Sequence, residues 1–176
     1  MTTTTYPLLA RPPLPTGVEF LGAVAVSGAA VTNMTVSGLS LSADQEYYIE
    51  FEIYNPTGST ASLYLFYNSD STLANYFGQS TVFTTTATAA RTSTPLIGAV
   101  VTVASINGVG WVKTNPQAQV RARVFTESAY SSAMDTRYAS TVWVLARRNV
   151  TSLTINSSVA SAIGVGSAMR VFRIKR

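Results

Sequence analysis

The segment EYYIEFEIYN, residues 46–55, alternates strictly between two kinds of side chain. Every second side chain is large and apolar, and the positions between them carry glutamates and tyrosines. A period of two is that of a strand with one buried and one exposed face, and Asn55-Pro56-Thr57-Gly58 then provides turn residues. The segment therefore predicts a half-buried strand with inner residues Tyr47, Ile49, Phe51 and Ile53, and outer residues Glu46, Tyr48, Glu50, Glu52 and Tyr54.

Short strands separated by turn signals are predicted along most of the chain, and no segment shows a sustained helical period. Strands at this spacing indicate two antiparallel sheets packed face to face. We expect an all-β fold, an antiparallel β-sandwich or jelly roll of about eight to ten strands over residues 17–176. The other predicted strands are 18–26, 33–37, 61–67, 76–85, 96–105, 110–113, 117–126, 136–146, 151–155 and 168–175.

The turns between these strands are predicted from short polar pairs. Asn107-Gly108, which lies between apolar runs, is the strongest hairpin signal in the chain. Further turn signals are Ser37-Gly38, Asn68-Ser69-Asp70, Asn115-Pro116 and Arg147-Arg148-Asn149.

Residues 1–16 predict an extended N-terminal arm, because four prolines exclude a helix and a central strand. The charge order is wrong for a secretory signal, since Arg11 follows the leucines. Fully stretched, the arm spans up to about 55 Å, whereas the compact remainder is about 40 Å across. Docking on a neighbouring subunit, a loose terminus and a polyproline ligand all remain open. The candidate assembly residues are Tyr6, Leu8, Leu9, Arg11, Pro12, Pro13 and Leu14.

The chain contains no histidine and no cysteine, which removes disulfides, thiolate metal sites and the commonest general base. No apolar run approaches the twenty or so residues that cross a bilayer. We therefore expect a soluble protein that is not an enzyme, with no catalytic residues, no metal and no cofactor, and for which a small-molecule ligand is unlikely. Asn68, Asp70 and Asp44 offer oxygen ligands for calcium without the EF-hand order, so an Asx turn is the better interpretation.

One hydrolase hypothesis survives, because Glu50 and Glu52 share a strand face and a glycosidase uses two carboxylates. Their side chains are parallel and about 7 Å apart, so they do not lie on opposite sides of a glycosidic bond. The sequence identifies no acid on another strand that would complete the pair. The aromatic residues Tyr48, Tyr54, Tyr64 and Phe66 suit a sugar platform, a protein interface or the core.

The net charge is +4, and only 11% of the residues are charged. The basic residues are spread along the chain, whereas a phosphate-binding arm concentrates them. We therefore expect no direct contact with nucleic acid. The candidate contacts with an acidic protein surface are Arg147, Arg148, Arg170, Arg173, Lys175 and Arg176, and the candidate interface on the central strand is Tyr48, Glu50, Glu52 and Tyr54.

Two segments resemble bacteriophage virion proteins of the jelly-roll type. One is the last 25 residues, in which a strand leads through a small-residue turn ending in Gly-Ser to a final strand, and the other is residues 46–68, preceded by Gly38-Leu39 and Asp44. The matching positions in the last segment are Leu153, Ile155, Gly164, Gly166, Ser167, Val171 and Phe172, and Tyr47 matches in the other.

This resemblance implies a structural virion component, and the lack of a shaft or repeat favours a compact capsid decoration or cement protein over a long fibre. It implies a homotrimer on the capsid exterior, made in the host cytoplasm, whose partners are itself and the major capsid protein. A receptor- or glycan-binding tail module is the alternative. A capsid shell protein and a glycan hydrolase are more remote.

Overall fold

The computed structural model describes residues 17–41, 46–83, 87–114, 119–130, 133–145 and 149–175. Within these ranges no helix has the length and apolar character needed to cross a membrane. The elements are β1 (Val18–Ala25), β2 (Asn33–Leu41), β3 (Glu46–Asn55), β4 (Ala61–Tyr67), the 3-10 helix η1 (Leu73–Asn75), β5 (Tyr76–Phe83), β6 (Ala87–Thr92), β7 (Leu96–Val100), β8 (Ala104–Thr114), β9 (Val120–Tyr130), β10 (Ala133–Trp143), β11 (Val150–Ser157) and β12 (Ala168–Ile174).

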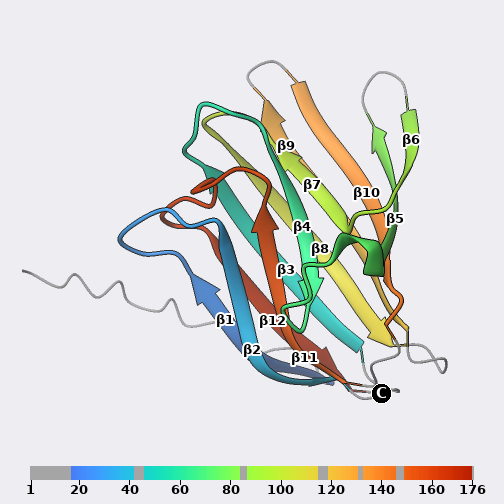
Figure 1. Cartoon of the computed structure of the whole chain (residues 1–176). Coiled ribbons are helices and arrows are strands. Elements are labelled where there is room, and N and C mark those ends of the chain that lie inside the picture. The colour runs from blue at the N-terminus through green and yellow to red at the C-terminus, as the bar shows by residue number, and fades with distance from the viewer. Residues whose placement is uncertain are drawn as a thin grey trace, which may run out of the picture.

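The strands form two antiparallel sheets packed as a sandwich (Figure 1). The large sheet has the order β1-β12-β3-β8-β9-β10-β5-β6, and the small sheet has the order β2-β11-β4-β7. Without β5, β6, β9 and β10, the order is that of an eight-stranded jelly roll in which β1-β12-β3-β8 faces β2-β11-β4-β7. The predicted fold class is therefore confirmed, and the four remaining strands extend the large sheet beyond the jelly roll.

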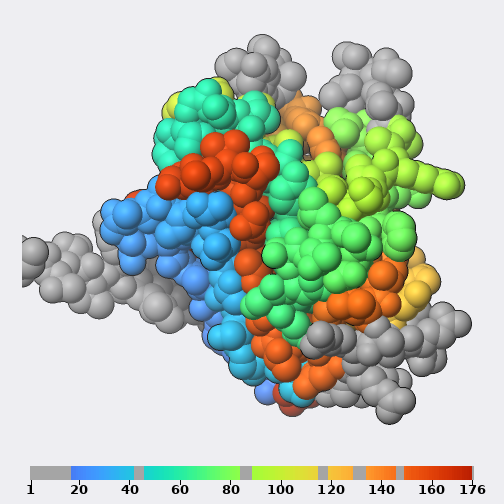
Figure 2. Space-filling model, in the orientation of Figure 1, coloured from blue at the N-terminus to red at the C-terminus, as the bar shows by residue number. Residues whose placement is uncertain are grey.

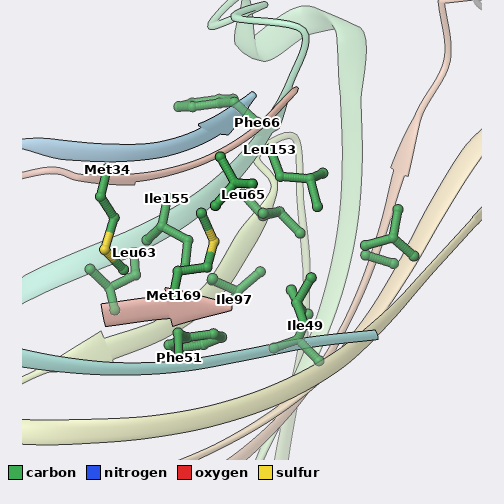
Figure 3. Close-up of a cluster of buried hydrophobic side chains, with 14 of the residues drawn as sticks. Met34, Ile49, Phe51, Leu63, Leu65, Phe66, Ile97, Leu153, Ile155 and Met169 are labelled. Atoms are coloured by element: carbon green, nitrogen blue, oxygen red, sulfur yellow. The ribbon is translucent and has the colours of Figure 1, made fainter. Parts of the chain in front are cut away.

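The core lies between the two sheets, where the inner side chains of both interdigitate. Tyr47, Ile49 and Ile53 are fully buried and Phe51 is nearly so, which confirms the alternation predicted for β3. Burial raises the pKa of Tyr47 to about 12. Figure 3 shows Ile49, Phe51 and Met169 of the large sheet together with Met34, Leu63, Leu65, Ile97, Leu153 and Ile155 of the small sheet.

The turn after β4 is built around Asp70. Its Oδ1 accepts a hydrogen bond from the backbone N–H of Thr72 at 3.1 Å, which is an Asx turn. Its Oδ2 accepts from Trp143 Nε1 at 2.7 Å and from Asn75 Nδ2 at 2.9 Å. Desolvation acts to raise the pKa of Asp70, but these hydrogen bonds outweigh it and hold the pKa below its usual range. Both carboxylate oxygens are thus occupied within the protein.

Trp143 also belongs to a stack of buried rings beneath this turn. Its centroid lies 5.7 Å from that of Tyr67 and 6.4 Å from that of Tyr76, and all three side chains are fully buried. Tyr76 donates its hydroxyl hydrogen to the carbonyl of Asp70 at 2.6 Å. Figure 2, seen from the side of the small sheet, shows the green segment that runs from β4 into β5 lying beside orange β11. The stack therefore joins the inserted strand β5 to the jelly roll.

The hairpin predicted at Asn107-Gly108 is wrong, because both residues lie inside β8. Gly108 is directly opposite Phe51 of β3, and a Cβ on Gly108 would lie 2.0 Å from Cζ of that ring. The glycine thus makes room for a core ring and provides no turn.

Three other element predictions are corrected. The strand predicted over 96–105 is two strands, since the chain turns at 101–103, where Val103 has a φ of 49°, and crosses from β7 in one sheet to β8 in the other. The turn predicted at Ser37-Gly38 is an irregularity within β2, where Gly38 has a φ of 74°. The strand β6 was not predicted, because its residues are mostly alanine and threonine and carry no apolar alternation.

Candidate interaction surface

The outer face of the large sheet carries most of the exposed apolar side chains. Ten large hydrophobic side chains are exposed among the described residues, and the strand register places seven of them on this one face. Exposed apolar side chains that share one face favour a binding surface, whereas ones scattered over the whole molecule need no explanation. The seven are Phe20, Tyr54, Phe77, Phe83, Trp111, Met134 and Tyr138, and the other three are Leu73 of η1 and the turn residues Val103 and Val165.

Four rings cross this face in one line, which we call the aromatic row: Phe20 of β1, Phe172 of β12, Tyr48 of β3 and Trp111 of β8. Successive ring centroids are 5.6, 6.0 and 5.5 Å apart. Such pairs contribute about 0.5–1.5 kcal/mol each beyond the burial of their area. The row is held by its own ring contacts, while Phe20 is 45% and Trp111 is 41% exposed. Its two end rings are thus presented to solvent, while Phe172 within the row is buried.

Carboxylates border the aromatic row along β3. Glu46, Glu50 and Glu52 point to the same face as Tyr48. Burial raises the pKa of the Tyr48 hydroxyl, and the negative charge of Glu50 raises it further. The predicted outward positions on β3 are confirmed, because Tyr54 and Glu52 are exposed and Tyr48 and Glu50 are half-buried.

Cations lie beside the aromatic row on β8 and β9, where Lys113 is directly opposite Glu46 of β3. Lys113 is directly opposite Arg121, and Trp111 is directly opposite Arg123. All three basic side chains are exposed, and none of them forms an ion pair with another described residue. The face therefore carries acids on β3 and bases on β8 and β9, and the aromatic row crosses both β3 and β8, which gives a partner both a charge pattern and an apolar anchor.

The C-terminal basic residues are divided between two environments. Arg173 Nη2 and Lys175 Nζ lie 2.6 Å and 3.1 Å from Glu19 Oε2, and these hydrogen bonds lower the pKa of Glu19. Arg170 is exposed on the outer face and lies directly opposite Glu50. Of the candidate basic contacts at this end, Arg173 and Lys175 are thus paired within the chain, and Arg170 is exposed on the outer face.

Several predicted site residues lie outside the described residues. These are the arm residues Tyr6, Leu8, Leu9, Arg11, Pro12, Pro13 and Leu14, the basic residues Arg147, Arg148 and Arg176, the calcium candidate Asp44, and Asn115-Pro116.

The four aromatics considered as one sugar platform do not lie together. Tyr48 and Tyr54 are on the outer face of the large sheet, whereas Tyr64 and Phe66 belong to β4 of the small sheet. Phe66 is buried against Tyr76, with ring centroids 5.5 Å apart.

The carboxylates of the hydrolase hypothesis have no acidic neighbour in the adjoining strands. Glu50 is opposite Val109 of β8 and Arg170 of β12, and Glu52 is opposite Asn107 of β8.

Sequence reasoning missed the half of this face that lies on β8 and β9. The signal was present, because Trp111 and Lys113 alternate with buried residues, as Arg121 and Arg123 do. Only the register places Trp111 beside Tyr48, and Arg123 beside Trp111. No protein-family model matches the chain, and no curated protein matches it. The chemistry of this face thus carries the functional interpretation.

Proposed function

We propose that this protein is a structural component of a bacteriophage virion, a decoration protein that binds the outside of the capsid and stabilises it by protein–protein contacts. The observation that carries the proposal is the aromatic row on the outer face of the large sheet, whose end rings, Phe20 and Trp111, are exposed. Exposed apolar side chains give a monomeric protein no gain in stability, whereas a protein that binds a partner buries them in the interface. The jelly-roll strand order and the resemblance to virion proteins favour a capsid as that partner.

The partner surface is the major capsid protein, and the contact is the part of the face that β1, β12, β3, β8 and β9 form. Five strands about 4.8 Å apart and about seven residues long give an area of about 550 Å². Specific interfaces bury about 600–1,000 Å² on each partner, so one copy binds with modest strength. Symmetric assembly multiplies the contact, and residues 1–16 add to it by reaching a neighbouring copy. We propose a homotrimer for this reason.

Oligomeric state is the first test, by light scattering on a sizing column. The full chain is compared with a chain that starts at Thr16. We expect a trimer for the full chain and a smaller or looser species for the shortened one. A full chain that stays monomeric on its own and on capsids contradicts the proposed self-assembly.

Capsid binding is tested with capsids of the virus that encodes this chain, prepared without the protein. Trp111→Ser removes the exposed end of the aromatic row, and Phe83→Ser, an exposed aromatic on the same face away from the row, is the matched control. We expect Trp111→Ser to weaken the free energy of capsid binding, measured by co-sedimentation, by about 2 kcal/mol or more, as the loss of a buried aromatic anchor does. Phe83→Ser should bind like the unaltered protein. Equal binding by both variants and the unaltered protein contradicts the proposed contact.

A further inference from the structure

A hollow of about 360 Å³ lies where β10, β5 and β6 run side by side. Its volume is at the small end of the range of small-ligand sites. Every residue that lines it belongs to one of these three strands, so paired backbone holds its shape. It is separate from the aromatic row, which lies over β1, β12, β3 and β8.

The floor of the hollow is a line of three polar side chains. Ser140 of β10 is directly opposite Gln79 of β5, and Gln79 is directly opposite Arg91 of β6. Adjacent strands are about 4.8 Å apart, so a hydroxyl, an amide and a guanidinium follow one another at the spacing of neighbouring polar groups on a small ligand. Val142 and Phe77, opposite each other on the next line, form an apolar wall, and Phe77 is 58% exposed.

The hollow is positively charged. Arg91 is exposed and forms no ion pair with another described residue. Arg123 of β9 lies directly opposite Ser140 and so extends the same line at its other end. The sequences of β5 and β6 contain no carboxylate. The one on β10, Asp135, faces the other side of the sheet, where its Oδ2 lies 3.9 Å from Arg137.

The side chains that line the hollow indicate which chemical groups its ligand carries. An exposed phenylalanine ring packs against an apolar ring face, an amide and a hydroxyl hydrogen-bond to ligand hydroxyls, and a guanidinium binds a carboxylate through two parallel hydrogen bonds. A pyranose ring with a carboxylate substituent presents all three features on one small molecule. We infer that this hollow is a binding subsite for an acidic sugar residue, a uronic or sialic acid, with Phe77 under the ring and Arg91 on the carboxylate.

This inference goes beyond the proposed capsid contact. It gives the inserted strands β5 and β6, which the jelly roll does not require, a role in recognising an acidic glycan. The residues that line the hollow belong to β5, β6 and β10, outside the proposed capsid contact, so either proposal is open to failure without the other.

The test is a chemical-shift titration of the ¹⁵N-labelled full chain with two acidic probes, methyl β-D-glucuronide and 3′-sialyllactose, each beside its neutral counterpart, methyl β-D-glucoside and lactose. The variants are Phe77→Ala and Arg91→Gln. Phe83→Ala, an exposed phenylalanine on the same strand and face, and Arg170→Gln, an exposed arginine elsewhere on the face, are the matched controls. Amide spectra of all four variants verify that each one is folded.

We expect at least one acidic probe to shift the amides of Phe77, Gln79, Arg91 and Ser140. The acidic probe that binds identifies the class of sugar, and its neutral counterpart should bind about tenfold or more weakly. Arg91→Gln should weaken acidic binding by about tenfold and remove the preference over the neutral sugar, and both controls should bind normally. The inference is overturned if neither acid shifts these amides up to about 10 mM, a concentration that detects millimolar dissociation constants. It is also overturned if the variants bind as the controls do, or if acetate binds as tightly as the sugar.

Discussion

At the scale of single residues, Asp70 determines whether the turn after β4 and the buried ring stack beneath it hold together. Asp70→Ala leaves the indole N–H of fully buried Trp143 without its acceptor and removes the Asx turn at Thr72. An unsatisfied buried donor costs about 1–3 kcal/mol. We expect the free energy of unfolding, measured in urea, to fall by that amount. Asp70→Asn retains oxygen at one of the two acceptor positions and should cost less; equal stability of all three proteins contradicts this account.

Two carboxylates also make the folded state sensitive to acid. The pKa of Glu19 lies below its ordinary value of 4.5 because Arg173 and Lys175 hydrogen-bond to it, and that of Asp70 lies below 3.8 although desolvation opposes the shift. A carboxyl whose pKa is lowered by folding contributes stability above its unfolded pKa, and this contribution is lost as the pH falls through the folded pKa. We therefore expect urea stability to decline below about pH 4.5. Glu19→Gln should make the decline shallower; an identical pH profile would show that Glu19 contributes nothing.

At the scale of whole strands, the contact of Gly108 with Phe51 fixes how β8 lies against β3. A Cβ at position 108 overlaps the phenylalanine ring, and overpacking of this kind costs about 1–3 kcal/mol. We expect Gly108→Ala to lower the midpoint of urea unfolding, and Phe51→Leu to restore part of the loss in the double variant. The matched control is Gly58→Ala, since a Cβ at Gly58 meets no atom within 4 Å. Additive effects of the two core substitutions contradict the proposed contact.

The same strands show what the sequence predicts and what it does not. The alternation in β3 and the apolar run of β4 are local patterns, so their strands were predicted to within a residue. The hairpin prediction at Asn107-Gly108 failed because the sequence alone does not distinguish a glycine in a turn from a glycine in a strand that makes room for a neighbouring ring. The half of the candidate surface on β3 was predicted from its alternation. Trp111 and Arg123 were not, because the placement of Trp111 beside Tyr48 and of Arg123 beside Trp111 depends on pairing between strands and cannot be read from a local pattern.

At the scale of the whole molecule, the two inserted pairs of strands widen one sheet and leave the other at four strands. The small sheet faces β1, β12, β3 and β8, and the added strands β9, β10, β5 and β6 extend the outer face of the large sheet. That face carries the aromatic row at one end and the polar hollow at the other. A wide sheet of this kind holds two binding regions on hydrogen-bonded backbone without any change to the jelly-roll core.

The fluorescence of the two tryptophans can be told apart by quenching, because Trp111 is 41% exposed on this face and Trp143 is fully buried in the core. We expect acrylamide to quench part of the fluorescence of the free protein, and Trp111→Phe to leave only the weakly quenched emission of Trp143. On capsids, burial of the aromatic row should protect Trp111, so that the bound protein is quenched like the Trp111→Phe variant. If Trp111 stays as accessible on the capsid as in solution, the protein docks through a different face, and the exposed apolar set serves another partner.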